Sequence, residues 1–172
     1  MKDNIILIGL MGAGKTTVGR YMANLWAMNF IDFDEEISKN LKMSINEIFK
    51  KYGERHFRKL EKGAIQKYST CKNFVISTGG GIVEDIENIE NLKKIGCLVY
   101  LKAAPEVLYE RIKDDTSRPL LKTKDPKREL FAIYEKRRKN YEMADIMVNT
   151  ENMTTKEIVS EIYEKINRKF KR

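Results

Sequence analysis

The residues with the clearest chemistry form a short glycine-rich stretch near the start of the chain. Residues 9–16 read GLMGAGKT and match the pattern G-x-x-x-x-G-K-[ST] in full. Glycines let the backbone curl so that successive N–H groups point at phosphate oxygens, and a following helix N-terminus adds positive potential. Lys15 can reach the β- and γ-phosphates, and the Thr16 hydroxyl can ligate Mg²⁺. The pattern therefore predicts a nucleoside triphosphate site rather than an ordinary glycine-rich turn.

Two aspartates follow the next apolar run. Asp32 and Asp34 are two residues apart, so on a strand both side chains would point to the same side. One carboxylate could then hold Mg²⁺ while the other accepts a proton from a substrate hydroxyl. The alternative is that Asp34 only caps the helix that follows. Both interpretations stay open at this point.

An arginine and a glutamate share one face of a predicted helix. Arg58 and Glu61 are three residues apart, which lets the carboxylate fix the guanidinium in one orientation. A planar guanidinium suits the bidentate binding of a carboxylate, so Arg58 is a candidate for gripping an anionic substrate. The alternative is an exposed helical ion pair, which contributes little to stability.

Three further features lie later in the chain. Gly79–Gly81 would let a ligand approach the backbone, unless they form only a glycine-rich turn. Arg118 lies in the charged stretch 114–128, which we interpret as a mobile loop able to fold over the phosphates and exclude water. Arg137 precedes Tyr141 by four residues on a predicted helix.

The elements that must position these residues alternate between strands and helices. Strands are predicted at 5–8, 30–34, 74–77, 97–101 and 145–148. Helices are predicted at 15–28, at 35–71 with a break at Gly53, at 86–95 and at 154–170; one more helix begins at Pro105, and another runs through Tyr141. Alternation of this kind indicates parallel strands joined by right-handed crossovers, with helices on both faces. Ligands bind at the carboxyl ends of such strands, which is where the candidate residues converge.

Composition limits the remaining classes of protein. A chain of 172 residues, 42% hydrophobic and 34% charged, is typical of one folded domain spanning 1–172. No apolar run approaches the roughly 20 residues of a membrane span, and we predict a cytoplasmic location. A net charge of +8 permits a nucleic-acid-binding ATPase, but basic and acidic residues are mixed along the helices. No N-K-x-D motif supports a GTPase, so a compact kinase is favoured.

Five ordered blocks make the sequence similar to the shikimate kinase family from end to end. They are GLMGAGKT at 9–16, DFD at 32–34, GERHFRKLE at 53–61, STGGG at 77–81 and RPLL at 118–121, and the Arg137–Tyr141 pair adds a sixth. The resemblance implies a three-layer α/β/α P-loop kinase with a five-stranded parallel sheet in the order 2-3-1-4-5, as in nucleoside monophosphate kinases. It also implies transfer of the γ-phosphoryl group of ATP, with Mg²⁺, to the 3-hydroxyl of shikimate on the route to chorismate.

The resemblance also assigns roles to individual residues. Shikimate would be bound by Asp34, Arg58, Gly80 and Arg137; the nucleotide by Gly12, Ala13, Gly14, Lys15, Thr16, Thr17, Arg111 and Arg118; the metal by Thr16 and Asp32; and catalysis would rest on Asp34, Lys15 and Arg118. Asp34 would be the base, and Arg111 would stack on adenine. Helices at about 35–60 would bind the substrate and about 112–125 would form a lid. The family expectation is a monomer with shikimate and ATP as its partners, and with neither nucleic acid nor membrane.

Two alternatives and two departures accompany this resemblance. A kinase of the same fold that acts on gluconate or a nucleoside monophosphate would share the phosphate loop, but would not need two arginines aimed at a small carboxylate. A nucleic-acid-binding ATPase would show hydrolysis stimulated by RNA or DNA. Many relatives carry a proline between the positions of Arg137 and Tyr141, where this chain has Arg-Lys-Asn, and the loop at 149–152 also lacks one.

Overall fold

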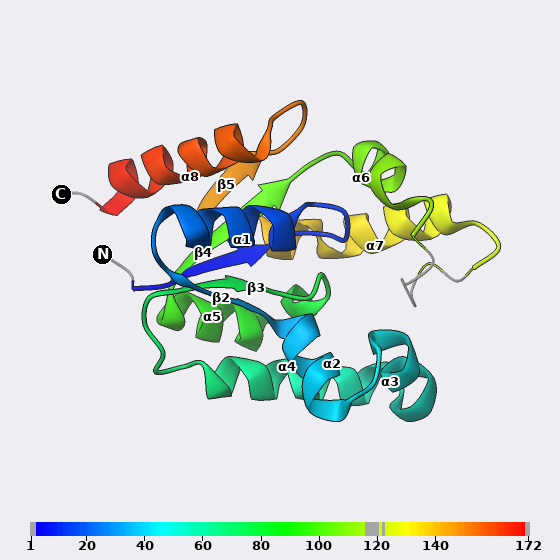
Figure 1. Ribbon diagram of the computed structural model, residues 1–172. Coiled ribbons are helices and arrows are strands. Elements are labelled where there is room, and N and C mark those ends of the chain that lie inside the picture. The colour runs from blue at the N-terminus through cyan, green and yellow to red at the C-terminus, as the bar shows by residue number, and fades with distance from the viewer. Residues whose placement is uncertain (1–2, 116–120, 122, 171–172) are drawn as a thin grey trace.

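One parallel sheet of five strands organises the protein. The structure, a computed structural model, describes residues 3–115, 121 and 123–170. The strands are β1 (Ile5–Ile8), β2 (Asn29–Asp32), β3 (Phe74–Ser77), β4 (Cys97–Lys102) and β5 (Ile146–Asn149). All pairings are parallel and the order is β2-β3-β1-β4-β5 (Figure 1), so the predicted fold class and strand order are confirmed.

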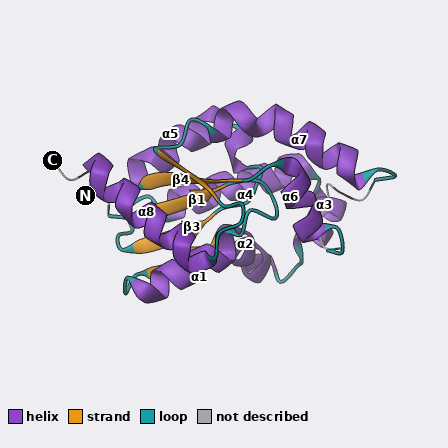
Figure 2. Ribbon diagram, turned by 90° about the horizontal axis from the view of Figure 1, so that it is seen from above, coloured by secondary structure: helices purple, strands orange, loops and turns teal. Residues whose placement is uncertain are grey.

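Helices cover both faces of this sheet. They are α1 (Lys15–Leu25), α2 (Phe33–Leu41), α3 (Ile45–Tyr52), α4 (Glu54–Lys67), α5 (Ile86–Ile95), α6 (Pro105–Ile112), α7 (Pro126–Tyr141) and α8 (Thr155–Phe170), with a short 3₁₀ turn, η1 (Ile82–Glu84). Viewed from above, α1 and α8 lie on one side of the sheet, and α5 and α7 on the other (Figure 2). Every residue of β1 is buried because both faces are covered, which explains its continuous apolar sequence.

The predicted strand 30–34 ends two residues too late. β2 ends at Asp32, and α2 begins at Phe33, so Asp34 lies in the first turn of a helix rather than on a strand. Asp32 Oδ1 accepts hydrogen bonds from the backbone N–H groups of Asp34, at 3.0 Å, and Glu35, at 3.3 Å. The cap of this helix is therefore Asp32 and not Asp34, since its carboxylate satisfies N–H groups that the helix leaves without partners.

The predicted helical region 35–71 contains two breaks rather than one. α2 ends at Leu41, followed by Lys42 in the left-handed conformation (φ 52°), and Ser44 then starts α3 through a reciprocal capping box with Glu47. The second break, at Gly53 (φ 78°), falls where the sequence predicts it. The predicted helix 15–28 also ends early, at Leu25, because Ala27 adopts a positive φ of 51°.

Two apolar clusters hold the fold together. The larger one fills the space between the sheet and its helices. The smaller one consists of Ile37, Ile48 and Phe57. These residues come from α2, α3 and α4, which are grouped together below the sheet in Figure 1. Packing of Phe57 here fixes the rotation of α4 and therefore the position of its neighbour Arg58. Within the described ranges, none of the helices is both long and apolar enough to cross a membrane.

Candidate active site

The phosphate loop connects β1 to α1 at the carboxyl edge of the sheet. Gly12 and Gly14 have φ of 83° and 84°, a left-handed conformation that other residues rarely adopt, so the glycines of the motif are required by its shape. Lys15 Nζ donates to the carbonyl oxygens of Gly9, at 2.8 Å, and Leu10, at 3.1 Å. In the described chain no side chain caps the first turn of α1. Its backbone N–H groups are therefore available to bind a phosphate group.

The two predicted metal ligands lie against one another. Thr16 Oγ1 donates to Asp32 Oδ2 at 2.7 Å, and Asp32 is 6% exposed. Hydroxyl and carboxylate oxygens are the ligands that Mg²⁺ prefers, so this pair fits the ion. Among the described residues, no group of three or more acidic, histidine or cysteine side chains is arranged so that it could hold a metal ion by itself. Mg²⁺ held at this pair would therefore take its other ligands from phosphates and water, which is its usual arrangement.

The glycine triplet brings the acceptor-side residues together. A Cβ atom at Gly79 would lie 2.6 Å from Glu61 Oε1 and 2.7 Å from Asp34 Oδ1. A Cβ atom at Gly81 would overlap the Arg58 guanidinium. Because real Cβ atoms do not approach other atoms so closely, a side chain at either position would displace the ends of these side chains. Three side chains from two helices thus meet the backbone that follows β3.

Gly80 links this cluster to the phosphate loop and to α7. Its carbonyl oxygen accepts a hydrogen bond from Tyr141 Oη at 2.5 Å, and a Cβ atom at this position would lie 3.4 Å from the Met11 backbone nitrogen. Arg137 lies one turn before Tyr141 on the same helix and is 2% exposed. The predicted Arg137–Tyr141 pair is therefore adjacent to the triplet.

Arg58 is held by acidic side chains on its own helix. Its Nη1 lies 2.7 Å from Glu61 Oε2, and its Nη2 lies 2.6 Å from Glu54 Oε1. The Glu61 side chain is 0% exposed, so the alternative of an exposed surface pair is wrong for Arg58 and Glu61. Burial raises the pKa of Glu61 to about 7, against the opposing effect of the Arg58 charge.

The sequence did not point to Glu84, which connects the two predicted substrate arginines. Its Oε1 lies 2.9 Å from Arg137 Nε and 3.5 Å from Arg58 Nη2, and it also pairs with Arg137 Nη2. Glu84 Oε2 accepts from Lys136 at 2.7 Å. An acid three residues after a glycine triplet is the only sequence signal for this contact, and it is too common to have been informative.

Of the two arginines predicted to bind the nucleotide, Arg111 and Arg118, only Arg111 lies within the described residues. Arg111 Nη2 donates to the Thr150 carbonyl at 3.0 Å, and Nη1 lies 3.4 Å from the Gly12 carbonyl. Arg111 therefore joins α6 to the phosphate loop, while its adenine contact stays a prediction. Arg118 lies outside the described residues, as do 116–120 and 122 of the predicted lid, so both predictions are untested.

Glu61 gives a testable pH dependence of stability. A glutamate whose pKa rises from 4.5 to about 7 on folding binds its proton more tightly in the folded state, so its stabilising contribution falls as pH rises from about 5 through 7. We expect Glu61→Gln to remove this slope, changing the wild-type-minus-variant difference in unfolding free energy by about 1 to 3 kcal/mol between pH 5 and 8. Urea unfolding of both proteins between pH 5 and 8 measures this difference. Parallel curves of unfolding free energy against pH would contradict the prediction.

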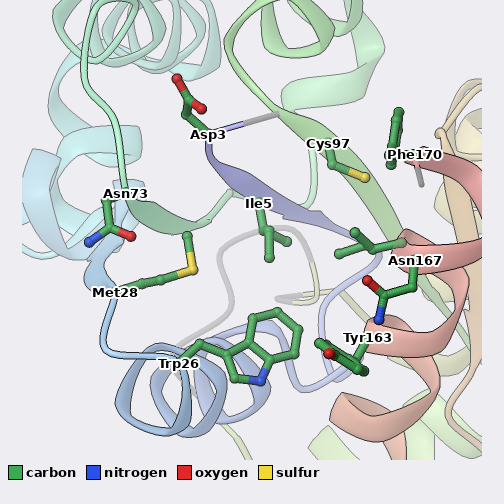
Figure 3. Close-up of a pocket in the computed structure, with 10 residues that line it drawn as sticks. Asp3, Ile5, Trp26, Met28, Asn73, Cys97, Tyr163, Asn167 and Phe170 are labelled. Atoms are coloured by element: carbon green, nitrogen blue, oxygen red, sulfur yellow. The ribbon is translucent and has the colours of Figure 1, made fainter. Parts of the chain in front are cut away.

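A cavity of about 340 Å³ lies at the amino ends of β1 and β4, at the end of the sheet away from the phosphate loop (Figure 3). Ile5 and Cys97 line it together with Trp26, Tyr163 and Phe170. The Trp26 and Tyr163 ring centroids are 5.9 Å apart. The cavity is remote from the phosphate loop and is not part of the candidate site. Since Trp26 is the only tryptophan, its fluorescence is a probe of folding rather than of ligand binding.

A phosphate loop, a Thr–Asp pair and two arginines that converge on Glu84, at the carboxyl edge of this parallel sheet, define a P-loop kinase. The shikimate kinase family model matches residues 11–167. A shikimate kinase of Caldanaerobacter subterraneus subsp. tengcongensis is 45% identical over 159 residues, covering 92% of this chain and 93% of the relative. The chain belongs to the shikimate kinase family.

Solved structures agree with this assignment. The shikimate kinase of Acinetobacter baumannii in complex with shikimate superposes with a TM-score of 0.94 at 35% identity, covering 99% of this chain and 96% of that one. The enzyme from Aquifex aeolicus gives 0.84 at 41% identity, with 95% and 96% covered. A deoxyadenosine kinase from M. mycoides, with a TM-score of 0.62 and 18% identity, shares the fold alone.

Proposed function

We propose that this enzyme transfers the γ-phosphoryl group of ATP to the 3-hydroxyl of shikimate, giving shikimate 3-phosphate and ADP for chorismate and aromatic amino acid biosynthesis. The observation that carries the proposal is that Arg58 and Arg137, far apart in sequence, reach the same carboxylate oxygen, that of Glu84 on η1. Two guanidiniums converging on one carboxylate suit an acceptor that has a carboxylate of its own. The relative solved with shikimate supports the same acceptor.

Some site residues bind the acceptor, and others stabilise the negative charge on the phosphoryl group that is transferred. Arg58 and Arg137 bind the acceptor carboxylate, and Gly80 lies against the ring. Asp34 orients the attacking hydroxyl and accepts its proton as the O–P bond forms. Lys15, with the N–H groups of the phosphate loop, stabilises the negative charge on the transferring group. Mg²⁺ bound at Thr16 and Asp32 would supply further charge neutralisation.

Several finer expectations belong to the same proposal. Residues 1–172 form one P-loop domain in which the helices at about 35–60 receive the acceptor. The enzyme works as a cytoplasmic monomer with small-molecule partners. The family match and the relative solved with shikimate favour shikimate over the rival acceptors, gluconate and nucleoside monophosphates.

Phosphoryl transfer to a panel of acceptors tests the proposal. The purified chain with ATP and Mg²⁺ is offered shikimate, gluconate, adenosine monophosphate, or RNA without an acceptor, and ADP release is followed. We expect kcat/KM for shikimate to exceed that for the other acceptors by at least about 10²-fold, because buried polar groups left without partners penalise the wrong acceptor. Phosphorus NMR of the product then identifies the phosphorylated hydroxyl. Preferred transfer to gluconate, or hydrolysis stimulated by RNA, would contradict the proposal.

A further inference from the structure

Glu84 places a carboxylate of the chain itself between the two acceptor arginines. It is the last residue of η1, directly after the glycine triplet, and its side chain is 22% exposed. One oxygen, Oε1, lies 2.9 Å from Arg137 Nε and 3.5 Å from Arg58 Nη2. Among the described residues, Glu84 is the one whose carboxylate contacts both guanidiniums.

The two arginines differ in the partners they have besides Glu84. Arg58 has two other acidic neighbours, Glu54 and Glu61, so its charge is already compensated without Glu84. Arg137 has an ion pair only with Glu84 in the described chain, and its Nη1 is buried with no hydrogen-bond partner there. A buried guanidinium with a spare donor has capacity for a further acceptor oxygen.

A ligand carboxylate that binds the same two nitrogens, Arg137 Nε and Arg58 Nη2, would put an oxygen where Glu84 Oε1 now lies. Two carboxylates cannot share that point, because like charges at contact distance repel strongly in a partly buried site. The other oxygen of Glu84 accepts from Lys136 at 2.7 Å, and the Lys136 side chain is 69% exposed. Lys136 therefore offers Glu84 an ion-pair partner on the solvent side once it leaves the arginines.

We propose that Glu84 determines acceptor affinity by holding the place of the acceptor carboxylate between Arg58 and Arg137 until the acceptor displaces it. This inference rests on the proposed function, because it requires an acceptor with a carboxylate. Glu84 keeps the arginines paired and oriented in the empty site, and an acceptor without a carboxylate cannot displace it. The apparent dissociation constant of the acceptor is then its intrinsic value divided by the fraction of molecules in which Glu84 has moved aside.

The decisive variant is Glu84→Gln, which keeps the shape of the side chain and removes its charge. If Glu84 occupies the arginines in roughly 70 to 90% of molecules, the KM for shikimate should fall by about 3- to 10-fold. The kcat should stay within about twofold, because Glu84 contacts neither the phosphate loop nor Asp34 in the described contacts. Calorimetric titration with shikimate in the absence of ATP should show the same fall in the dissociation constant.

Glu87→Gln is the matched control. It makes the same change of charge on the neighbouring helix α5, where Glu87 pairs with Lys62 at 3.0 Å and contacts neither arginine. We expect its KM to equal that of the wild type. An unchanged or raised KM in Glu84→Gln would overturn the inference, and a raised KM with a lowered kcat would make Glu84 a residue that orients Arg137. A wild-type enzyme that neither binds nor phosphorylates shikimate would instead refute the proposed function.

Discussion

Lys15→Ala is expected to lower kcat for phosphoryl transfer by roughly 10²-fold or more. Phosphoryl transfer needs little covalent help from the protein, so most of the rate enhancement comes from positioning and from stabilising charge on the transferring group. In the structure the Lys15 ammonium folds back onto the carbonyl oxygens of Gly9 and Leu10, at the mouth of the loop. It is therefore placed to turn toward phosphate oxygens, which are stronger acceptors than carbonyls.

Initial rates at saturating ATP and shikimate measure this effect, and thermal melting confirms that the variant is folded. Lys94→Ala is a suitable control because Lys94 lies on α5, where its ammonium bonds only to Asn91 among the described residues. The control should retain wild-type kcat. If Lys15→Ala kept more than about one tenth of the wild-type kcat, the electrostatic role of this lysine would be refuted.

Local sequence signals predicted those parts of the protein whose structure is decided locally. The phosphate loop is continuous in sequence, and its glycines have the φ values that the motif requires. The alternating elements predicted a parallel sheet, and the family resemblance alone supplied the strand order, which the structure confirms. The error at Asp32 and Asp34 is also local: an aspartate after an apolar run is equally compatible with a longer strand and with a helix cap, and only the capping hydrogen bonds decide.

Contacts between distant segments could not be predicted in the same way. Tyr141 donates to Gly80, 61 residues away, and Arg137 pairs with Glu84 across 53 residues. Neither pairing has a periodic or motif signal, because it depends on how α7 packs against η1. The burial of Glu61, which turns a helical ion pair into part of the site, likewise follows from packing against the glycine triplet rather than from its spacing to Arg58.

Asp34→Asn should lower kcat by roughly 10²- to 10⁴-fold while the KM for ATP changes little. Asp34 lies in the first turn of α2 beside Gly79 and next to Asp32, which fixes the backbone of that turn. Asparagine keeps the size of the side chain and can still orient a hydroxyl, but it cannot accept the proton. The size of the loss therefore distinguishes a general base from a group that only positions the acceptor.

Glu35→Gln is the control for this substitution. Glu35 is the next residue in the same helical turn, so both variants remove one negative charge near the positive N-terminus of α2. Its side chain is 57% exposed and pairs with Arg20 at the surface. We expect Glu35→Gln to retain wild-type kcat in the same steady-state assay. A fall of less than about tenfold for Asp34→Asn would mean that Asp34 orients the hydroxyl without removing its proton, because loss of general-base catalysis costs about 10²-fold or more.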